Sequence, residues 1–155
     1  MARQRHGRGG DMDKSDHAVE EFSGGLNCAQ AVLGEYAEDN DLDLDIALRV
    51  ACGFGGGIGS LGDMCGAVTG AVMAIGLLSA GPDARDPGAK AATSAAVRSF
   101  IEEFRKRHGA CTCRDLLGCD ISTPEGLLEA RSRGLMQTQC PELVRDAVRI
   151  IEEMV

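Results

Sequence analysis

The sequence MCGAVTGAVMAIGLLSAGP, residues 64–82, contains no charged side chain. Apolar residues recur in it at the spacing of one helical face, at Val68, Val72, Ile75 and Leu78. A membrane span is the alternative interpretation, but four glycines and a modest apolar count argue against it. Gly66 and Gly70 form a small-xxx-small pair, which lets a second helix approach closely. The segment therefore predicts a helix buried in the protein core.

The segment before this helix, CGFGGGIGSLG at residues 52–62, is uncharged and has six glycines among eleven residues. Such a composition predicts a loop with special backbone requirements, which we expect to be buried. It is not a dinucleotide-binding fingerprint, because that motif follows a strand and no strand pattern precedes it. Either the loop packs tightly around a helical turn, or its backbone lies close to a cofactor or to the cysteines. In the second case the candidate cofactor-binding residues are Gly55, Gly56, Gly57 and Gly59.

Helical patterns also precede this loop, and no period-2 strand pattern interrupts them. A first helix is expected from about Lys14 to Phe22. Asn27 is a good N-cap for a second helix, and Asp43 is a good N-cap for a third. We expect the third helix to carry one apolar face, formed by Ile46, Ala47, Val50 and Ala51.

Helical patterns continue after the break GPDARDPG at residues 81–88. The helix that follows is expected to run to about His108, and Pro124 and Pro141 each start a further helix. The terminal helix is expected to bury Leu143, Val144, Ala147, Val148, Ile151 and Met154. Residues 13–155 therefore predict an all-α fold, a single-domain compact bundle of about six to seven helices.

The net charge is −8 at pH 7, which argues against a nucleic-acid partner because such binding depends on Lys and Arg neutralising phosphates. The basic residues Arg3, Arg5 and Arg8 cluster at the start, and we interpret residues 1–12 as a disordered basic arm. This arm lacks an apolar stretch, so it matches neither a signal peptide nor a membrane anchor. No membrane partner is expected, and the expected location is the cytoplasm.

Seven cysteines are the most informative feature: Cys28, Cys52, Cys65, Cys111, Cys113, Cys119 and Cys140. In a reducing cytoplasm, clustered cysteines more often indicate redox chemistry or metal binding than structural disulfides. There is no CxxC pair, so a zinc knuckle is disfavoured, but thiolates from distant helix ends could still hold zinc or an iron–sulfur cluster. His108 is either a ligand or base beside Cys111 or, as we prefer, a solvated residue at a helix end.

Four of these cysteines lie at predicted helix N-termini: Cys28, Cys65, Cys113 and Cys140. Free backbone N–H groups and the positive end of the helix dipole lower a thiol pKa at such positions. We therefore expect at least one of Cys28 and Cys65 to have a pKa below the free value of about 8.5. We also expect the four side chains to converge in the fold. The alternative is that each cysteine packs as a small apolar side chain.

Four segments carry a family resemblance: GGLNCAQAVL at 24–33, GFGGGIGSLGDMCGAVTGAVMAIGL at 53–77, CRDLLGCDIS at 113–122 and CPELVRDAVRIIEEM at 140–154. Together they resemble the C_GCAxxG_C_C family, which is described as redox-active. The resemblance implies that Cys28, Cys65, Cys113 and Cys140 are the family cysteines, and that Cys52, Cys111 and Cys119 are additional. One departure is Met64, which stands directly before Cys65 where the family name has glycine. The resemblance implies no particular reaction or substrate.

We therefore expect a redox-active protein in which Cys28, Cys65, Cys113 and Cys140 are catalytic thiolates or metal ligands. They would exchange disulfides, or they would bind a metal cluster that moves electrons, so the protein would be an oxidoreductase or an electron carrier. Its partner would be a redox protein or a small thiol, and a homo-oligomer stays open. Two other interpretations remain, a zinc or iron–sulfur protein whose metal stabilises the fold and a non-catalytic helical interaction module.

Overall fold

The structure is a computed structural model that describes residues 12–155. Within these residues the chain is all-α, and its single β-type pairing is an isolated bridge between Met64 and Thr112. The predicted fold class is therefore confirmed. The predicted basic arm falls almost entirely on residues 1–11, which lie outside the described residues.

The helices follow the order predicted from the sequence pattern. Their bounds are α1 Lys14–Ser23, α2 Cys28–Ala37, η1 Glu38–Asn40, α3 Leu44–Ala51, η2 Cys52–Phe54, α4 Gly66–Ser79, α5 Pro87–His108, α6 Cys113–Leu117, α7 Pro124–Ser132, α8 Leu135–Thr138 and α9 Cys140–Met154. Both predicted N-caps are confirmed, because Asn27 forms a capping box with Gln30 and the Asp43 side chain accepts the N–H of Ile46. Helix α8 adds to the predicted set, since four residues are too few to show an apolar period, and the predicted helix start at Cys113 is that of α6, which has five residues.

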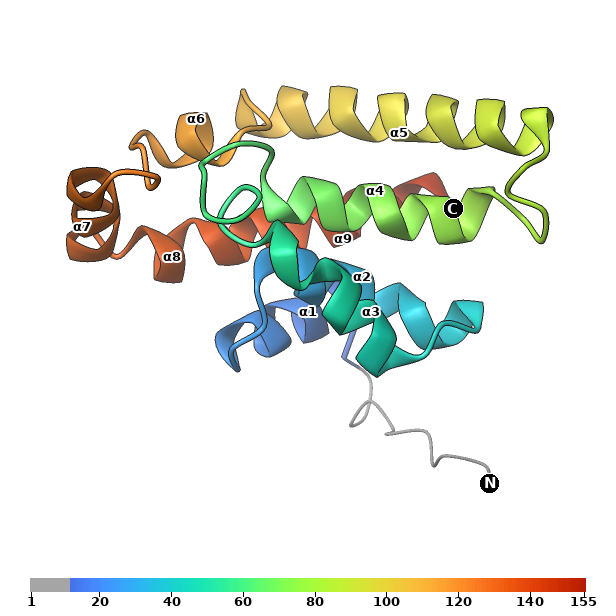
Figure 1. Ribbon diagram of the computed structural model, residues 1–155, viewed down its shortest axis with the longest axis horizontal. Helices are drawn as coiled ribbons and strands as arrows, with labels where there is room; N and C mark the ends of the chain where they lie inside the picture. Colours follow the sequence, from blue (N-terminus) through green and yellow to red (C-terminus); the bar gives the residue numbers. More distant parts are fainter. Residues whose placement is uncertain (1–11) are drawn as a thin grey trace.

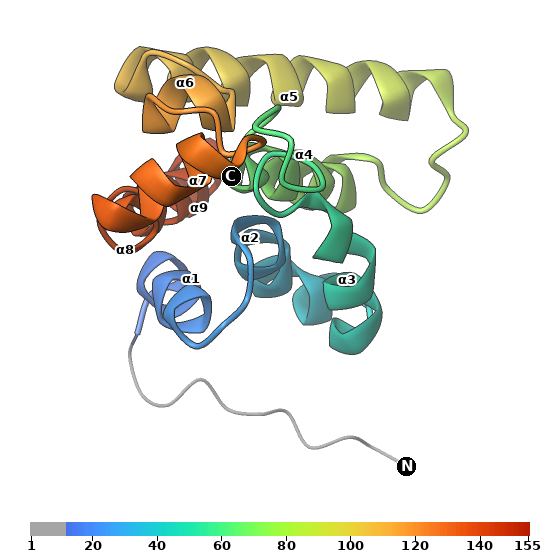
Figure 2. The same ribbon diagram turned by 60° about the vertical axis from the view of Figure 1, so that its left-hand side comes forward.

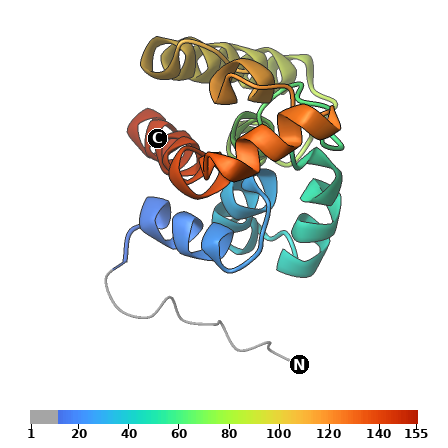
Figure 3. The ribbon, with the colours of Figure 1, turned by 90° about the vertical axis from the view of Figure 1, so that its left-hand side faces the viewer.

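The helices stack in three layers (Figure 1). The long α5 forms one outer layer, α4 and α9 lie in the middle, and α1, α2 and α3 form the other outer layer, an order that Figure 2 shows from a second side. The middle layer is therefore covered on both faces. Its fully buried side chains include Val68, Val144 and Val148. The short helices α6, α7 and α8 lie at one end of the stack, which faces the viewer in Figure 3.

Helices α2 and α4 pack closely because α4 carries two glycines at the contact. A Cβ on Gly70 would lie 2.7 Å from the carbonyl oxygen of Ala29, and one on Gly66 would lie 3.0 Å from the Cβ of Cys28. These distances are shorter than van der Waals contact, so a larger residue would force the helices apart. The predicted role of the Gly66 and Gly70 pair is confirmed, and the contact places the start of α4 against the start of α2.

Several apolar side chains that the pattern predicted to face inward lie at the surface. Ile46 and Val50 of α3 are 49% and 58% exposed, and Met154 at the end of α9 is 39% exposed. Helix α3 buries its small residues, Ala47 and Ala51, so the larger side chains beside them lie outside the contact. In α3, the positions of the alanines therefore indicate the buried face more accurately than the spacing of the large apolar residues does.

The membrane interpretation of residues 64–82 does not hold. Helix α4 ends at Ser79 after 14 residues, whereas a span needs about 20. No helix in the described part of the chain is long and apolar enough to cross a bilayer.

The glycine-rich loop has an unusual backbone. Five consecutive residues, 56–60, have φ between 56° and 73°, in the left-handed region. The N–H of Asp63 donates to the carbonyl oxygen of Gly57 at 2.9 Å and closes the loop. Gly57 and Gly62 are buried, but residues 58–61 are exposed. The predicted burial of the loop is therefore correct for Gly57 and Gly62 but wrong for residues 58–61, because the left-handed turn directs these residues toward solvent.

Candidate functional site

The four cysteines selected from the sequence all start helices. Cys28, Cys113 and Cys140 are the first residues of α2, α6 and α9, and Cys65 is the N-cap of α4. Cys28 and Cys140 share a hydrogen bond, and the charges of Cys113 and Cys140 act on both Cys28 and Cys65. The structure thus brings these side chains together, and we call Cys28, Cys65, Cys113 and Cys140 the thiol cluster.

Backbone pairing holds two members of the thiol cluster side by side. The N–H of Cys65 donates to the carbonyl oxygen of Cys111 at 2.8 Å. The N–H of Cys113 donates to the carbonyl oxygen of Asp63 at 2.7 Å. These bonds fix the start of α4 against the start of α6. The position of Cys113 relative to Cys65 is therefore set by main-chain hydrogen bonds, which do not depend on the side chains.

The glycine-rich loop lies against the thiol cluster. A Cβ on Gly57 would lie 2.8 Å from the Cβ of Cys113, and one on Gly55 would lie 2.9 Å from Nδ2 of Asn27, the cap of α2. The loop backbone therefore lies close to the cysteines, as one of the two interpretations of this segment expects. Cofactor binding stays a prediction for Gly55, Gly56, Gly57 and Gly59.

Cys140 is the member of the thiol cluster whose pKa is lowered. The Cys28 thiol donates a hydrogen bond to the Cys140 sulfur, which is the main cause, and the backbone N–H of Cys140 adds to it. Helix α9 has no side-chain cap, so no capping oxygen competes for the positive end of its dipole, whereas Asn27 caps α2. The same hydrogen bond, together with burial, raises the pKa of Cys28 well above its ordinary value. Within this pair Cys140 is therefore the more acidic sulfur and Cys28 the less acidic one.

Burial governs the other two members. It raises the pKa of Cys65 to about 12, although the N–H groups of Ala67 and Val68 partly oppose the shift. Burial likewise raises the pKa of Cys113 to about 11. The prediction that Cys28 or Cys65 has a lowered pKa is therefore wrong. At these positions the free energy lost by removing a thiolate from water is larger than the stabilisation that the helix N-terminus provides.

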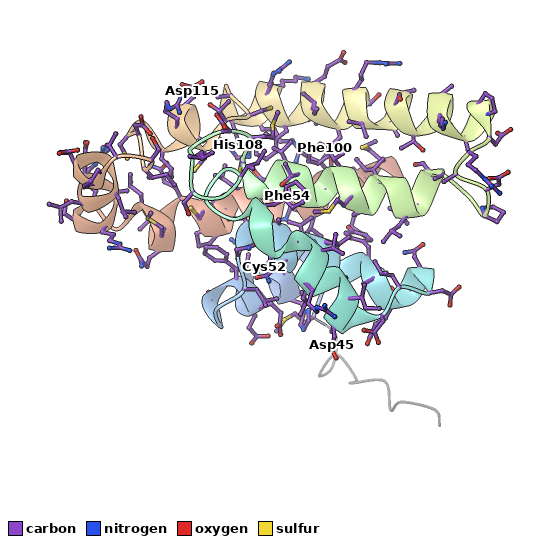
Figure 4. All side chains as sticks on the ribbon, viewed as in Figure 1. Asp45, Cys52, Phe54, Phe100, His108 and Asp115 are labelled. Carbon is purple, nitrogen blue, oxygen red and sulfur yellow. The ribbon has the colours of Figure 1, made fainter. Side chains whose placement is uncertain are left out.

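The three additional cysteines occupy different environments, and all seven cysteines are free thiols. Cys119 packs in one apolar cluster with Cys113 and Cys140. The sequence pattern did not single it out, although the glycine before it signals a chain reversal. Cys111 is buried in the main core, and Cys52 is exposed directly after α3, where Figure 4 labels it.

His108 lies at the end of α5 and packs its ring on Phe104, with the ring centroids 4.7 Å apart. Its Nε2 is 2.9 Å from Oδ2 of Asp146 on α9, within ion-pair distance but at an angle that makes no hydrogen bond. The residue is partly buried, so the expectation of a fully solvated histidine is wrong, because α9 covers this end of α5. His108 links two helices, and a role as ligand or base stays a prediction.

Among residues 12–155, no three His, Cys, Asp or Glu side chains are placed as the ligands of one metal ion. As arranged, Cys28, Cys65, Cys113 and Cys140 do not fit a zinc or iron–sulfur site. Metal binding by these residues stays a prediction.

Comparison with known proteins agrees with the pattern of cysteines. The family model described as "Putative redox-active protein (C_GCAxxG_C_C)" matches residues 26–154, which contain the whole thiol cluster. No curated protein and no solved structure matches the chain. The matched residues make up most of the sequence, and the resemblance seen in the four segments is confirmed. The chain therefore belongs to the C_GCAxxG_C_C family.

Proposed function

We propose that the protein exchanges disulfides through Cys28 and Cys140, with Cys140 as the attacking thiolate. The packing of Cys28 against the apolar cluster that contains Cys140 carries the proposal, and the pairing of the two thiols, which lowers the pKa of Cys140, selects the nucleophile. This pairing makes Cys140 the sulfur of the two that ionises more readily. A thiolate is the nucleophile in disulfide exchange, and a second thiol within reach is needed to release the product.

The reaction moves two electrons from the protein to a disulfide substrate. The Cys140 thiolate attacks one substrate sulfur, so a mixed disulfide forms and the first substrate thiolate leaves. The Cys28 thiol gives its proton to that leaving thiolate and attacks the Cys140 sulfur. The bond between Cys28 and Cys140 forms, the mixed disulfide breaks, and the second substrate thiolate leaves. The protein dithiol is then oxidised and the substrate disulfide is reduced.

The protonation of the other two cysteines supports the choice of Cys140. At neutral pH, Cys65 and Cys113 keep their protons because burial raises the pKa of these thiols to about 12 and about 11. Cys140 is then the member of the thiol cluster that attacks the substrate disulfide. Cys28 is its only partly exposed member, so the substrate would approach from that side. The substrate would be the disulfide of a redox protein or of a small thiol, and a reducing cytoplasm would restore the dithiol.

The test is the pKa of Cys140 in the full chain. The folded protein is alkylated at a series of pH values and then digested with trypsin, and the rate at which Cys140 reacts is measured on the peptide that carries it, residues 134–145. In the wild type we expect Cys140 to titrate below about 8.5, the free value of a thiol. Cys28→Ala should raise this pKa by about 1–2 units, because a hydrogen bond to a charged group contributes about 1.5–3 kcal/mol.

Cys65→Ala is the matched control. Cys65 is a buried thiol of the same cluster, but Cys28 is the hydrogen-bond partner of Cys140. The control variant should therefore leave the Cys140 titration unchanged. A wild-type Cys140 that titrates at or above the free thiol value of about 8.5 would contradict the proposal, and so would equal shifts in the two variants.

A further inference from the structure

Cys119 is a buried cysteine that the proposed reaction does not use. It packs against the end of the bundle in one apolar cluster with Cys113 and Cys140. Gly118 ends α6 in the left-handed conformation, with φ 71°, and turns the chain back after a single helical turn. Cys119 therefore follows the same short helix that Cys113 starts. Its thiol lies 3.8 Å from the carbonyl oxygen of Leu117, which is a weak hydrogen bond.

Packing shows which sulfurs are neighbours, because Cys113, Cys119 and Cys140 share one apolar cluster and Cys28 packs against it. Negative charge on Cys140 raises the pKa of Cys113, and negative charge on Cys119 does the same. Cys113 is therefore close to both. Cys28 pairs with Cys140 and Cys113 shares its cluster with Cys119, so we call Cys28, Cys140, Cys113 and Cys119 the sulfur series.

We propose that Cys119 is the resolving thiol of a second dithiol, with Cys113, which takes over the disulfide first formed between Cys28 and Cys140. This inference rests on the proposed function. Cys113 makes the transfer, since it shares one apolar cluster with both Cys140 and Cys119. The transfer restores the thiolate of Cys140 for a second substrate, so one chain stores two disulfides.

Each step of the transfer breaks one S–S bond and forms another, so it needs no further oxidant. Cys113 attacks the Cys140 sulfur and gives its proton to Cys28, which leaves as a thiol. Cys119 then attacks the Cys113 sulfur and releases its proton to water, and Cys140 leaves as a thiolate. The second dithiol is now a disulfide. A second substrate disulfide can oxidise Cys28 and Cys140 again.

Tryptic mapping separates the four sulfurs of the series. Cleavage after Lys and Arg places Cys28 on residues 15–49, Cys113 on 108–114, Cys119 on 115–131 and Cys140 on 134–145. The full chain is treated with oxidised glutathione, quenched with N-ethylmaleimide at intervals and digested without reduction. We expect a first link between peptides 15–49 and 134–145. A second link, between peptides 108–114 and 115–131, should follow it.

Three variants assign the second link. Cys119→Ala should abolish it and keep the first link. Cys111→Ala is the matched control, because Cys111 is also buried and lies on the same peptide as Cys113, and this variant should keep both links. Cys140→Ala removes the sulfur from which the disulfide is transferred, so the second link should form at least about tenfold more slowly.

The outcomes separate this inference from the proposed function on which it rests. A wild type that forms only the first link overturns the role of Cys119 and leaves the exchange at Cys28 and Cys140 intact. A wild type without the first link overturns the proposed function itself. A second link that forms at an unchanged rate in Cys140→Ala overturns the transfer, because Cys113 and Cys119 would then be oxidised directly. The wild-type map decides the main point even if Cys119→Ala does not fold.

Discussion

Gly57→Ala and Gly59→Ala add the same methyl group at two left-handed positions of one loop. The two glycines have φ of 73° and 56°, so each alanine would carry about 1–2 kcal/mol of left-handed strain. Their surroundings differ. A Cβ at Gly57 would lie 2.7 Å from the nitrogen of Asp63 and 2.8 Å from the Cβ of Cys113, whereas nothing lies within 4 Å of a Cβ at Gly59. The pair therefore separates backbone strain from contact with the thiol cluster.

The expected losses of stability follow from these two contributions. Gly59→Ala carries only the strain, about 1–2 kcal/mol. Gly57→Ala adds overpacking of about 1–3 kcal/mol, for a total of about 2–5 kcal/mol. A chain of this length loses roughly 2–4 °C in Tm for each kcal/mol. We therefore expect Tm to fall by about 2–8 °C for Gly59→Ala and by about 4–20 °C for Gly57→Ala.

Thermal unfolding of the reduced proteins, followed by circular dichroism, measures the loss of stability. Alkylation of Cys113 is the second readout, because the Asp63 carbonyl accepts the Cys113 N–H at 2.7 Å and passes a displacement to α6. At equal fractions folded, Cys113 should react faster in Gly57→Ala than in Gly59→Ala. Equal losses of Tm with equal alkylation of Cys113 would refute the conclusion that the loop is packed on this cysteine.

Other substitutions test the core and the buried thiols. Gly70→Val should destabilise the protein by at least about 1–3 kcal/mol in urea unfolding, because its side chain would overlap Ala29, whereas Gly76→Ala, with open space around it, should stabilise α4 by about 0.5–1 kcal/mol. Cys65 keeps its proton up to pH about 12 when folded and loses it near 9.0 when unfolded, so the free energy of unfolding should fall between these pH values, by about 4 kcal/mol. In Cys65→Ala, the free energy of unfolding measured with urea should not show this fall at alkaline pH. The same pH dependence in the variant and the wild type would disprove the assignment of the fall to Cys65.

Local features of the site could be predicted from the sequence. The caps Asn27 and Asp43 form as predicted, because a cap depends on residues within one helical turn. The spacing of Gly66 and Gly70 likewise predicts a close helix contact, and α2 makes it. The positions of the four cluster cysteines at helix starts follow from the same short-range signals.

Features that depend on neighbours far along the chain could not be predicted. The apolar period of α3 does not show that Ile46 and Val50 lie outside the core, since this depends on how α2 packs against the alanines beside them. Cys119 was treated as an additional cysteine because it lies within a short segment without helical periodicity. Its place beside Cys113 follows from the left-handed turn at Gly118 and from the packing of the bundle end.

The pKa values of the thiols likewise depend on one local effect, which the sequence shows, and on effects of distant residues, which it does not show. The helix dipole is a local effect, so the sequence by itself placed all four cysteines where a lowered pKa is favoured. Burial and hydrogen bonding come from other helices, and they reverse the expectation for Cys28 and Cys65. A pKa is the sum of all these effects: desolvation is the largest of them at Cys65 and Cys113, whereas the hydrogen bond between Cys28 and Cys140 is the largest at those two sulfurs. The sequence therefore determined where the sulfurs lie along their helices, whereas the packing of α2 against α4 and α9 determined that the pKa of Cys140 is lowered and that of Cys28 is raised.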